Sequence, residues 1–329
     1  MDRTISHPWR RAARLATATA IAFGLSVSAC GGATAEQPAA TAAVAKATVG
    51  TTTATTTPTS PSPAAVALNV QASASGSSLL LKADQIAVPA GDVKITFKNT
   101  DPKMDHELWV YPVQDVTKLL AARRAGEDAD EDKFLQDSAG SSDSVAPGGS
   151  KDFIVSLKPG FYELACFEQM KNADGSTVVH FDKGQTATLA VIGAGGPAAS
   201  IATAASSLNV AMKDGAYGSW VLIPDHLVAT AGQVTVNVTN NMKINHDFVV
   251  YPIGDVSAQI AEGLKAGEDI DLDIAQPIAE DLEPGKTATK TIALTPGTYV
   301  MACFMVSKNA DGSTFVHRDM GQRITFVVK

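Results

Sequence analysis

Short stretches of alternating or continuous apolar residues recur from residue 92 to the C-terminus and predict β-strands. They are rich in β-branched and aromatic side chains, which strands favour. Pro-Gly and Ala-Gly pairs lie between several of them and mark turns. About seven short strands in each half of this region argue for antiparallel β-sandwiches. The clearest stretches form two similar series, at 92–99, 106–112, 151–158, 161–166 and 186–192, and at 233–240, 246–252, 289–295, 298–304 and 324–328.

The two series belong to an internal repeat of whole domains. Residues 87–116 match residues 228–256, and residues 157–192 match residues 294–328. Such a duplication predicts two tandem domains of the same fold. One segment in each repeat has helical spacing and predicts a short helical insertion, at 116–128 and at 256–269. The predicted boundaries are a first domain at 67–193, a linker at 194–206 and a second domain at 207–329.

The N-terminal region predicts a targeting signal followed by a tether. Residues 1–29 combine a basic start with a short apolar stretch, which is typical of an export signal and too short for an ordinary membrane span. The end of this signal, Val27 to Cys30, resembles a bacterial lipobox, which implies cleavage before Cys30 and a lipid on its sulfur. An ordinary signal peptide with an incidental cysteine is the alternative. Residues 30–66 are nearly all Ala, Thr, Pro, Gly and Ser and predict a disordered linker.

Composition and motifs narrow the classes of function. The net charge is −8 and only 18% of residues are charged, so the chain lacks the basic surface of a nucleic-acid binder. The sequence contains no G-x-S-x-G, P-loop, H-E-x-x-H or dinucleotide fingerprint. It also lacks the paired H-x-H motifs of a multicopper oxidase. We therefore expect a protein that is not an enzyme.

The three cysteines are Cys30, Cys166 and Cys303. An exported protein meets oxidising conditions, in which cysteines normally pair. Cys166 and Cys303, however, occupy equivalent positions in the two repeats, and such positions are rarely close enough for a disulfide. We therefore expect one unpaired thiol in each domain, which needs a functional reason in that compartment.

Each repeat also places two histidines around its cysteine. His106 and His246 follow an Asn-containing turn, whereas His180 and His317 follow the shared KNADGST segment. Met320 comes three residues after the last of these histidines. One thiolate, two imidazoles and a weakly bound thioether form the ligand set of a blue-copper site. The alternative is a buried apolar cysteine beside a shared turn, with no metal nearby.

The order of these motifs resembles the cupredoxin family, to which plastocyanin and azurin belong. The chain reads H-E/D-L/F-x-V-Y-P, then P-G-x-Y-x-x-x-C, and then H-x-x-M-G in the second repeat. The resemblance covers both repeats and implies an all-β protein of two tandem Greek-key sandwiches that hold one or two type 1-like copper ions. The ligands it implies are His246, Cys303, His317 and Met320 in the second repeat, and His106, Cys166 and His180 in the first.

The ligand loop departs from the family pattern in two ways. Thirteen residues separate Cys303 from His317, where small blue-copper proteins have only a few. The insert contains Asp-Gly, a tight-turn signal, so we expect a hairpin that returns His317 to Cys303. The family also usually reads Gly-Met near the end of this loop, whereas this chain reads Met320-Gly321. A methionine displaced from the axial position is therefore an alternative.

The first repeat departs further, because Lys183 stands where the second repeat has its methionine. A lysine ammonium would repel copper. Gln185, which has a twin in Gln322, is then the candidate axial ligand, since glutamine can take that place. Loss of the metal from the first domain is the alternative.

The sequence thus predicts a copper-binding electron-transfer lipoprotein, with the second domain as the more complete site. We expect it on the periplasmic or cell-surface face of the membrane, anchored through Cys30, with a redox protein of the cell envelope as its partner and no nucleic acid. One alternative is a protein that sequesters or delivers copper or iron without a redox role. Another is a metal-free sandwich used for protein contacts.

Overall fold

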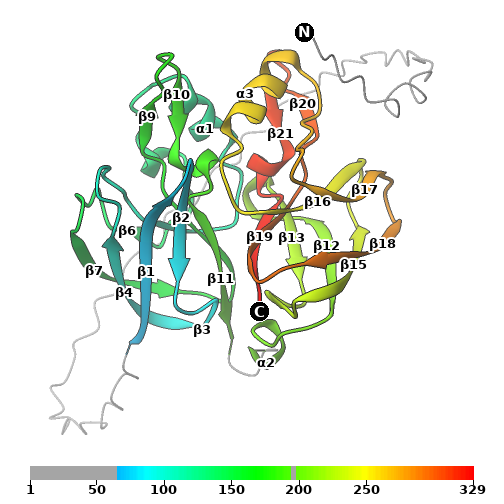
Figure 1. Ribbon diagram of the computed structural model, residues 1–329, viewed down its shortest axis with the longest axis horizontal. Helices are drawn as coiled ribbons and strands as arrows, with labels where there is room; N and C mark the ends of the chain where they lie inside the picture. The colour runs from blue at the N-terminus through cyan, green and yellow to red at the C-terminus, as the bar shows by residue number, and fades with distance from the viewer. Residues whose placement is uncertain (1–64, 194–197) are drawn as a thin grey trace, which may run out of the picture. The chain divides into compact units, whose positions relative to one another are not determined.

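The structure, a computed structural model, describes residues 65–193 and 198–329, and these form two β-sandwiches, one from each repeat (Figure 1). The predicted signal peptide, Cys30 and nearly all of the tether lie outside the described residues. No helix in the described part of the chain is long and apolar enough to cross a bilayer. The helices are α1 (Thr117–Arg124), α2 (Ala198–Ile201) and α3 (Ser257–Ala266).

The first repeat forms a four-stranded sheet and a five-stranded sheet whose apolar faces share one core cluster. The four-stranded sheet has the order β2-β1-β4-β7, with β1 at Val66–Ser75, β2 at Ser78–Ala83, β4 at Gly91–Asn99 and β7 at Ser150–Leu157. The other has the order β3-β11-β8-β5-β6, with β3 at Ala87–Pro89, β5 at Trp109–Pro112, β6 at Gly140–Ser141, β8 at Gly160–Ala165 and β11 at Thr186–Ile192. The inward side chains of β4 are buried at every second position, as its period-two pattern predicts.

The second repeat has the same strand order. Its four-stranded sheet is β13-β12-β15-β18, with β12 at Ser207–Asp214, β13 at Trp220–Pro224, β15 at Gly232–Asn240 and β18 at Thr287–Leu294. Its five-stranded sheet is β14-β22-β19-β16-β17, with β14 at Val228–Ala229, β16 at His246–Pro252, β17 at Gln276–Leu282, β19 at Gly297–Ala302 and β22 at Arg323–Val328. The predicted all-β sandwiches, each with a short inserted helix, α1 or α3, are therefore confirmed.

The expectation of purely antiparallel sandwiches was wrong. β1 pairs parallel with β4 and β3 pairs parallel with β11, and the second repeat has the same parallel pairs, β12 with β15 and β14 with β22. Parallel neighbours need a crossover connection. The chain supplies it by passing from the four-stranded sheet to the five-stranded sheet at β3, or at β14, before it returns. Alternation along a strand predicts which of its faces is buried. It does not predict whether the neighbouring strand runs parallel or antiparallel to it.

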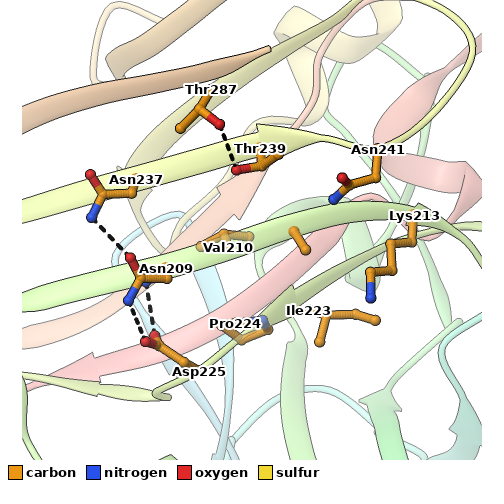
Figure 2. A pocket seen from close by; sticks show the side chains of 11 residues that line it. Asn209, Val210, Lys213, Ile223, Pro224, Asp225, Asn237, Thr239, Asn241 and Thr287 are labelled. Atoms are coloured by element: carbon orange, nitrogen blue, oxygen red, sulfur yellow. Dashed lines mark hydrogen bonds between the residues drawn. The ribbon is translucent and has the colours of Figure 1, made fainter. Parts of the chain in front are cut away.

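The outer face of the four-stranded sheet in the second repeat is polar. Figure 2 shows a pocket on this face, lined by asparagine and threonine side chains from neighbouring strands. Asn237 Nδ2 donates to Asn209 Oδ1 at 3.0 Å, and the hydroxyls of Thr239 and Thr287 lie 2.9 Å apart. Cross-strand pairs of this kind stabilise a solvated sheet face. None of the predicted metal ligands lines this pocket.

The two repeats contact each other along β11 and β22. Thr188 and Thr325, which hold equivalent positions in these strands, exchange hydrogen bonds. The Thr188 amide donates to Thr325 Oγ1 at 2.6 Å, and the Thr325 amide donates to Thr188 Oγ1 at 2.9 Å. The contact is therefore built around a local two-fold relation between the repeats.

Six charged side chains form a cluster beside this contact, with formal charges that cancel. Arg124 donates through Nε to Asp182 Oδ2 at 2.8 Å and through Nη1 to Asp319 Oδ2 at 2.7 Å. Burial by itself raises the pKa of Asp182, but Arg124 and then Arg318 outweigh it and lower that pKa to about 2. Buried charges of this kind are tolerated only when they are paired. This interrepeat charge cluster consists of Arg124, Glu163, Asp182, Arg318, Asp319 and Arg323.

Two equivalent glycines allow the repeats to approach this closely. Gly184 and Gly321 have φ values of +98° and +104°, in the left-handed region that favours glycine. A Cβ on Gly184 would lie 3.0 Å from the carbonyl oxygen of Gly254 in the opposite repeat. A Cβ on Gly321 would lie 2.9 Å from the carbonyl oxygen of Trp220 in its own repeat and 3.3 Å from that of Gln114 in the opposite repeat.

Candidate metal centres

Three of the predicted ligands meet in the second repeat. His246 begins β16, Cys303 directly follows β19, and His317 begins η4, a 3₁₀ turn at His317–Met320. Cys303 Sγ lies 3.9 Å from His246 Nδ1 and 3.5 Å from His317 Nδ1, and the two Nδ1 atoms are 3.2 Å apart. All three side chains are buried. We call this group site two.

The first repeat brings the equivalent residues together in site one. Cys166 follows β8, and His180 begins η2, a 3₁₀ turn at His180–Lys183. His106 Nδ1 and His180 Nδ1 are 3.1 Å apart, and Cys166 Sγ lies 3.5 Å from His180 Nδ1. Both cysteines are unpaired, as the sequence predicted for the two domains.

A hairpin returns each second histidine to its cysteine. In the second repeat, β20 (Val306–Lys308) and β21 (Thr314–Val316) pair across the Asp311-Gly312 turn. The Ser313 amide donates to Asp311 Oδ1 at 2.9 Å, and the His317 amide donates to the Met305 carbonyl at 2.9 Å. The first repeat forms the same hairpin from β9 (Gln169–Lys171) and β10 (Thr177–Val179), which packs against α1 (Figure 1). The long loop therefore does not separate the ligands.

A buried carboxylate directly after the first histidine, Glu107, connects the ligand segments of site one. The Glu107 amide lies 3.5 Å from Cys166 Sγ, and Glu107 Oε1 accepts a hydrogen bond from the Phe167 amide at 2.9 Å. Burial raises the pKa of Glu107 to about 7. Because Glu107 follows His106 and Phe167 follows Cys166, this side chain ties the two ligand segments together. The only sign of this role in the sequence is the position of Glu107 directly after His106.

Burial keeps the donors of site two uncharged when no metal is bound. It raises the pKa of the Cys303 thiol, and it lowers the pKa of His246 to about 4 and that of His317 to about 3. Ser307 Oγ lies 2.8 Å from His317 Nε2. When Nε2–H donates to this hydroxyl, the Nδ1 lone pair is left free to face the cysteine.

These donors fit a metal ion. Two ligand atoms that share a metal at about 2 Å can be at most about 4 Å apart, and the measured separations of 3.1–3.9 Å meet this limit. One thiolate and two imidazoles are a soft, trigonal donor set of the kind that selects copper. The residues present therefore fit the metal that the family resemblance implies.

A buried glutamine lies beside one histidine of each site. Gln185 and Gln322 are fully buried, and each main-chain carbonyl accepts the amide of its site's cysteine at 3.2 Å. Gln185 lies by His180 and Gln322 by His246, where each favours the protonated imidazole. Neither side-chain oxygen has a hydrogen-bond partner of good geometry. A buried, unpaired amide oxygen costs about 1–3 kcal/mol, so a partner for this oxygen is expected. In site two, the buried Nε2 of His246 also lacks a partner.

The sequence assigned Gln185 to site one but did not assign its twin to site two. The signal was available, because Gln322 follows His317 at the same spacing as Gln185 follows His180. In site one the methionine position is held by Lys183, whose Nζ pairs with Asp255 Oδ2 of the second repeat at 2.6 Å. Met320, at the equivalent place, is partly buried. Its role as an axial ligand stays a prediction.

The two sites have different surroundings. The Trp220 ring lies 4.6 Å from the His317 ring and 5.4 Å from the His246 ring, centroid to centroid, and covers site two. In the first repeat, strand pairing places Leu79 at the position of Trp220. Site one instead borders a surface pocket lined by Lys103, Met104, Asp105, Glu168, Gln169, Met170 and His180.

The strand order and the three convergent donors decide the fold. Each repeat is a cupredoxin-like sandwich. No protein-family model matches the sequence, and no curated protein matches it.

The comparison with solved structures finds blue-copper proteins and a multicopper oxidase. A dithionite-reduced auracyanin from the photosynthetic bacterium Roseiflexus castenholzii is 20% identical, over 37% of this chain and 95% of its own, with a TM-score of 0.26. Auracyanin A, a "blue" copper protein from Chloroflexus aurantiacus, is 15% identical, over 38% of this chain and 98% of its own, with a TM-score of 0.24. The multicopper oxidase is 15% identical, over 80% of this chain and 88% of its own, with a TM-score of 0.26.

The protonation of the cupredoxin-like site two gives a pH dependence for metal binding. In the Cys166→Ser protein, which keeps only site two, Zn²⁺ should release one proton, from the Cys303 thiol. The imidazoles are already neutral, because burial lowers their pKa values to about 3 and about 4. Affinity should therefore fall about tenfold for each pH unit of acidification near neutral pH. Competition titrations at several pH values measure the slope, and a slope of two or more protons would contradict this assignment.

Proposed function

We propose that the protein binds copper at both sites and carries single electrons. One observation carries this proposal. Each of two separate His/Cys/His groups is buried, and within each group the donor atoms lie within 4.8 Å of one another. The thiolate and the two imidazoles of each site would hold the copper ion, whose Cu(I)/Cu(II) couple would release or accept one electron. The sheets fix the donors from three different segments, and burial excludes water from them. Little rearrangement of the chain is then needed when the charge of the site changes.

The ligands follow from this geometry. Site two uses His246, Cys303 and His317, and site one uses the equivalent residues His106, Cys166 and His180. We assign the weak fourth ligand to the glutamine amide oxygens, since glutamine is a known axial ligand in sites of this type. Their lack of any other partner supports this assignment.

Copper titration of the mature protein tests the proposal. We expect two equivalents of copper, an intense visible absorption from thiolate-to-copper charge transfer, and a reversible one-electron wave in voltammetry. A colourless protein that takes up no copper would refute it. Colour without a reversible wave would refute electron transfer alone.

The fourth ligand of site two can be tested by comparing two substitutions. Gln322→Leu should shift the absorption band and the reduction potential of site two, because the amide oxygen is lost while the volume is nearly kept. Met320→Leu should change neither quantity. Both variants are made in the Cys166→Ser protein, so that the spectra report site two alone. A shift with Met320→Leu and none with Gln322→Leu would restore the methionine as the ligand.

A copper-delivery role without redox work is the second candidate. The pocket beside His180 is lined by the thioethers of Met104 and Met170, and soft sulfur ligands favour Cu(I). If this pocket serves delivery, the rate of Cu(I) transfer from site one to a chelator should fall when both methionines become leucine. An unchanged rate would count against this role. Tight binding with no reversible wave would favour it.

We also propose that the protein is exported and anchored through a lipid on Cys30, with a redox protein of the cell envelope as its partner. The lipobox resemblance of residues 27–30 supports this proposal. Metabolic labelling with a fatty acid should label the wild-type protein and leave a Cys30→Ala protein unlabelled. Labelling of both would refute the anchor.

A further inference from the structure

The turn that carries the second histidine of each site is held by the opposite repeat. The main-chain carbonyl of Asp182, in η2, accepts the Val256 amide at 3.0 Å, and that of Asp319, in η4, accepts the Val116 amide at 2.9 Å. Val116 and Val256 immediately precede α1 and α3. The turn of each repeat therefore completes the start of the helix in the other.

Side chains of the interrepeat charge cluster reinforce this exchange. Arg318, next to His317, donates through Nη1 to Asp182 Oδ1 at 2.9 Å, and its guanidinium lies 4.7 Å from the centre of the Phe181 ring. Phe181 and Asp182 are the two residues that follow His180. In the other direction, Arg124 of the first repeat holds Asp319, two residues after His317, at 2.7 Å.

We propose that the second histidine of each metal centre is positioned by the opposite repeat, with Arg318 as a positioning residue for site one and Arg124 for site two. The proposal rests on metal binding as proposed above. It goes beyond that function, because it makes the two centres interdependent, although each takes its donors from one repeat only.

The length of these turns explains why such support is needed. η2 and η4 are four residues each, and 3₁₀ turns of this length have few internal hydrogen bonds to fix their orientation. Each ends at a left-handed glycine that lies against the opposite repeat. Contacts outside the ligand set orient metal-binding imidazoles, and their loss typically lowers metal affinity about 10–100-fold.

The test measures one site while the opposite repeat is changed. In the Cys303→Ser protein only site one binds copper, and Arg318→Met should weaken its copper affinity about 10–100-fold and shift its absorption band. In the Cys166→Ser protein only site two remains, and Arg124→Leu should weaken that site in the same way. Leucine is the residue that the second repeat carries at the same distance from the start of its helix, Leu264. Competition with a copper chelator gives the affinities.

Two further variants separate positioning from a general loss of stability. Thr325→Val removes a hydrogen bond between the repeats away from η2 and η4, and it should leave the affinity and the spectrum unchanged in both backgrounds. Arg318→Lys keeps the buried charge but cannot reach Asp182 and Phe181 together, so part of the loss should remain even if Arg318→Met does not fold.

The outcomes distinguish this inference from the proposed function. If the two single-site parents bind copper and the arginine variants do so with unchanged affinity and spectra, the inference is overturned and the function stands. An equal loss with Thr325→Val would also overturn it, because any disturbance of the contact would then suffice. If the parents bind no copper, both proposals fail.

Discussion

Replacing Cys303 by serine is expected to remove the thiolate-to-copper absorption of site two and to reduce the bound copper from two equivalents to one. Sulfur is the soft donor of the set, and a serine hydroxyl does not ionise near neutral pH to replace it. Cys303 is fully buried and unpaired, so the substitution is small and breaks no disulfide. Visible spectra and copper analysis of the purified protein give both quantities.

The duplicated site supplies the matched control. Cys166→Ser should remove the absorption of site one and leave that of site two, and the two single-variant spectra should add up to the wild-type spectrum. The double variant should bind no copper at either site. Retention of both equivalents in Cys303→Ser would exclude the His/Cys/His group as the metal centre.

Local patterns in the sequence were enough to predict the strands and the hairpin that position the ligands. Period-two alternation identified the strands before His246 and Cys303, and Asp311-Gly312 identified the hairpin that returns His317. These signals are local, because side-chain alternation and turn chemistry act over a few residues. The internal repeat then carried each assignment from one half of the chain to the other.

Features that depend on contacts between distant segments could not be predicted from the sequence. The parallel pairing of β1 with β4 follows from the path of the chain between two sheets. The unpaired amide oxygen of Gln322 can be recognised only when its surroundings are known. Nothing in the sequence marked Arg318 and Asp319 as paired across the repeats, because their partners, Asp182 for Arg318 and Arg124 for Asp319, lie in the other repeat.

In the interrepeat charge cluster, a substitution of one charged residue should lower the free energy of unfolding strongly. A paired substitution that removes two opposite charges should lower it less. Asp182→Leu leaves Arg124 and Arg318 to share Asp319, and it should destabilise the metal-free protein by about 3–5 kcal/mol, as expected when one member of a buried ion pair is removed. Asp182→Leu with Arg318→Met removes one charge of each sign and fills the space with apolar groups, so it should cost less than Asp182→Leu alone.

Urea unfolding of the metal-free proteins measures these differences, with Thr325→Val as the reference for the loss of an interrepeat hydrogen bond outside the cluster. If the double variant loses as much stability as the two single variants together, Asp182 and Arg318 act independently. The 2.9 Å contact between them would then not be what joins the repeats. A double variant that is folded and stable would instead separate the two roles of the cluster, because stability would be kept while Arg318 no longer holds the turn that carries His180.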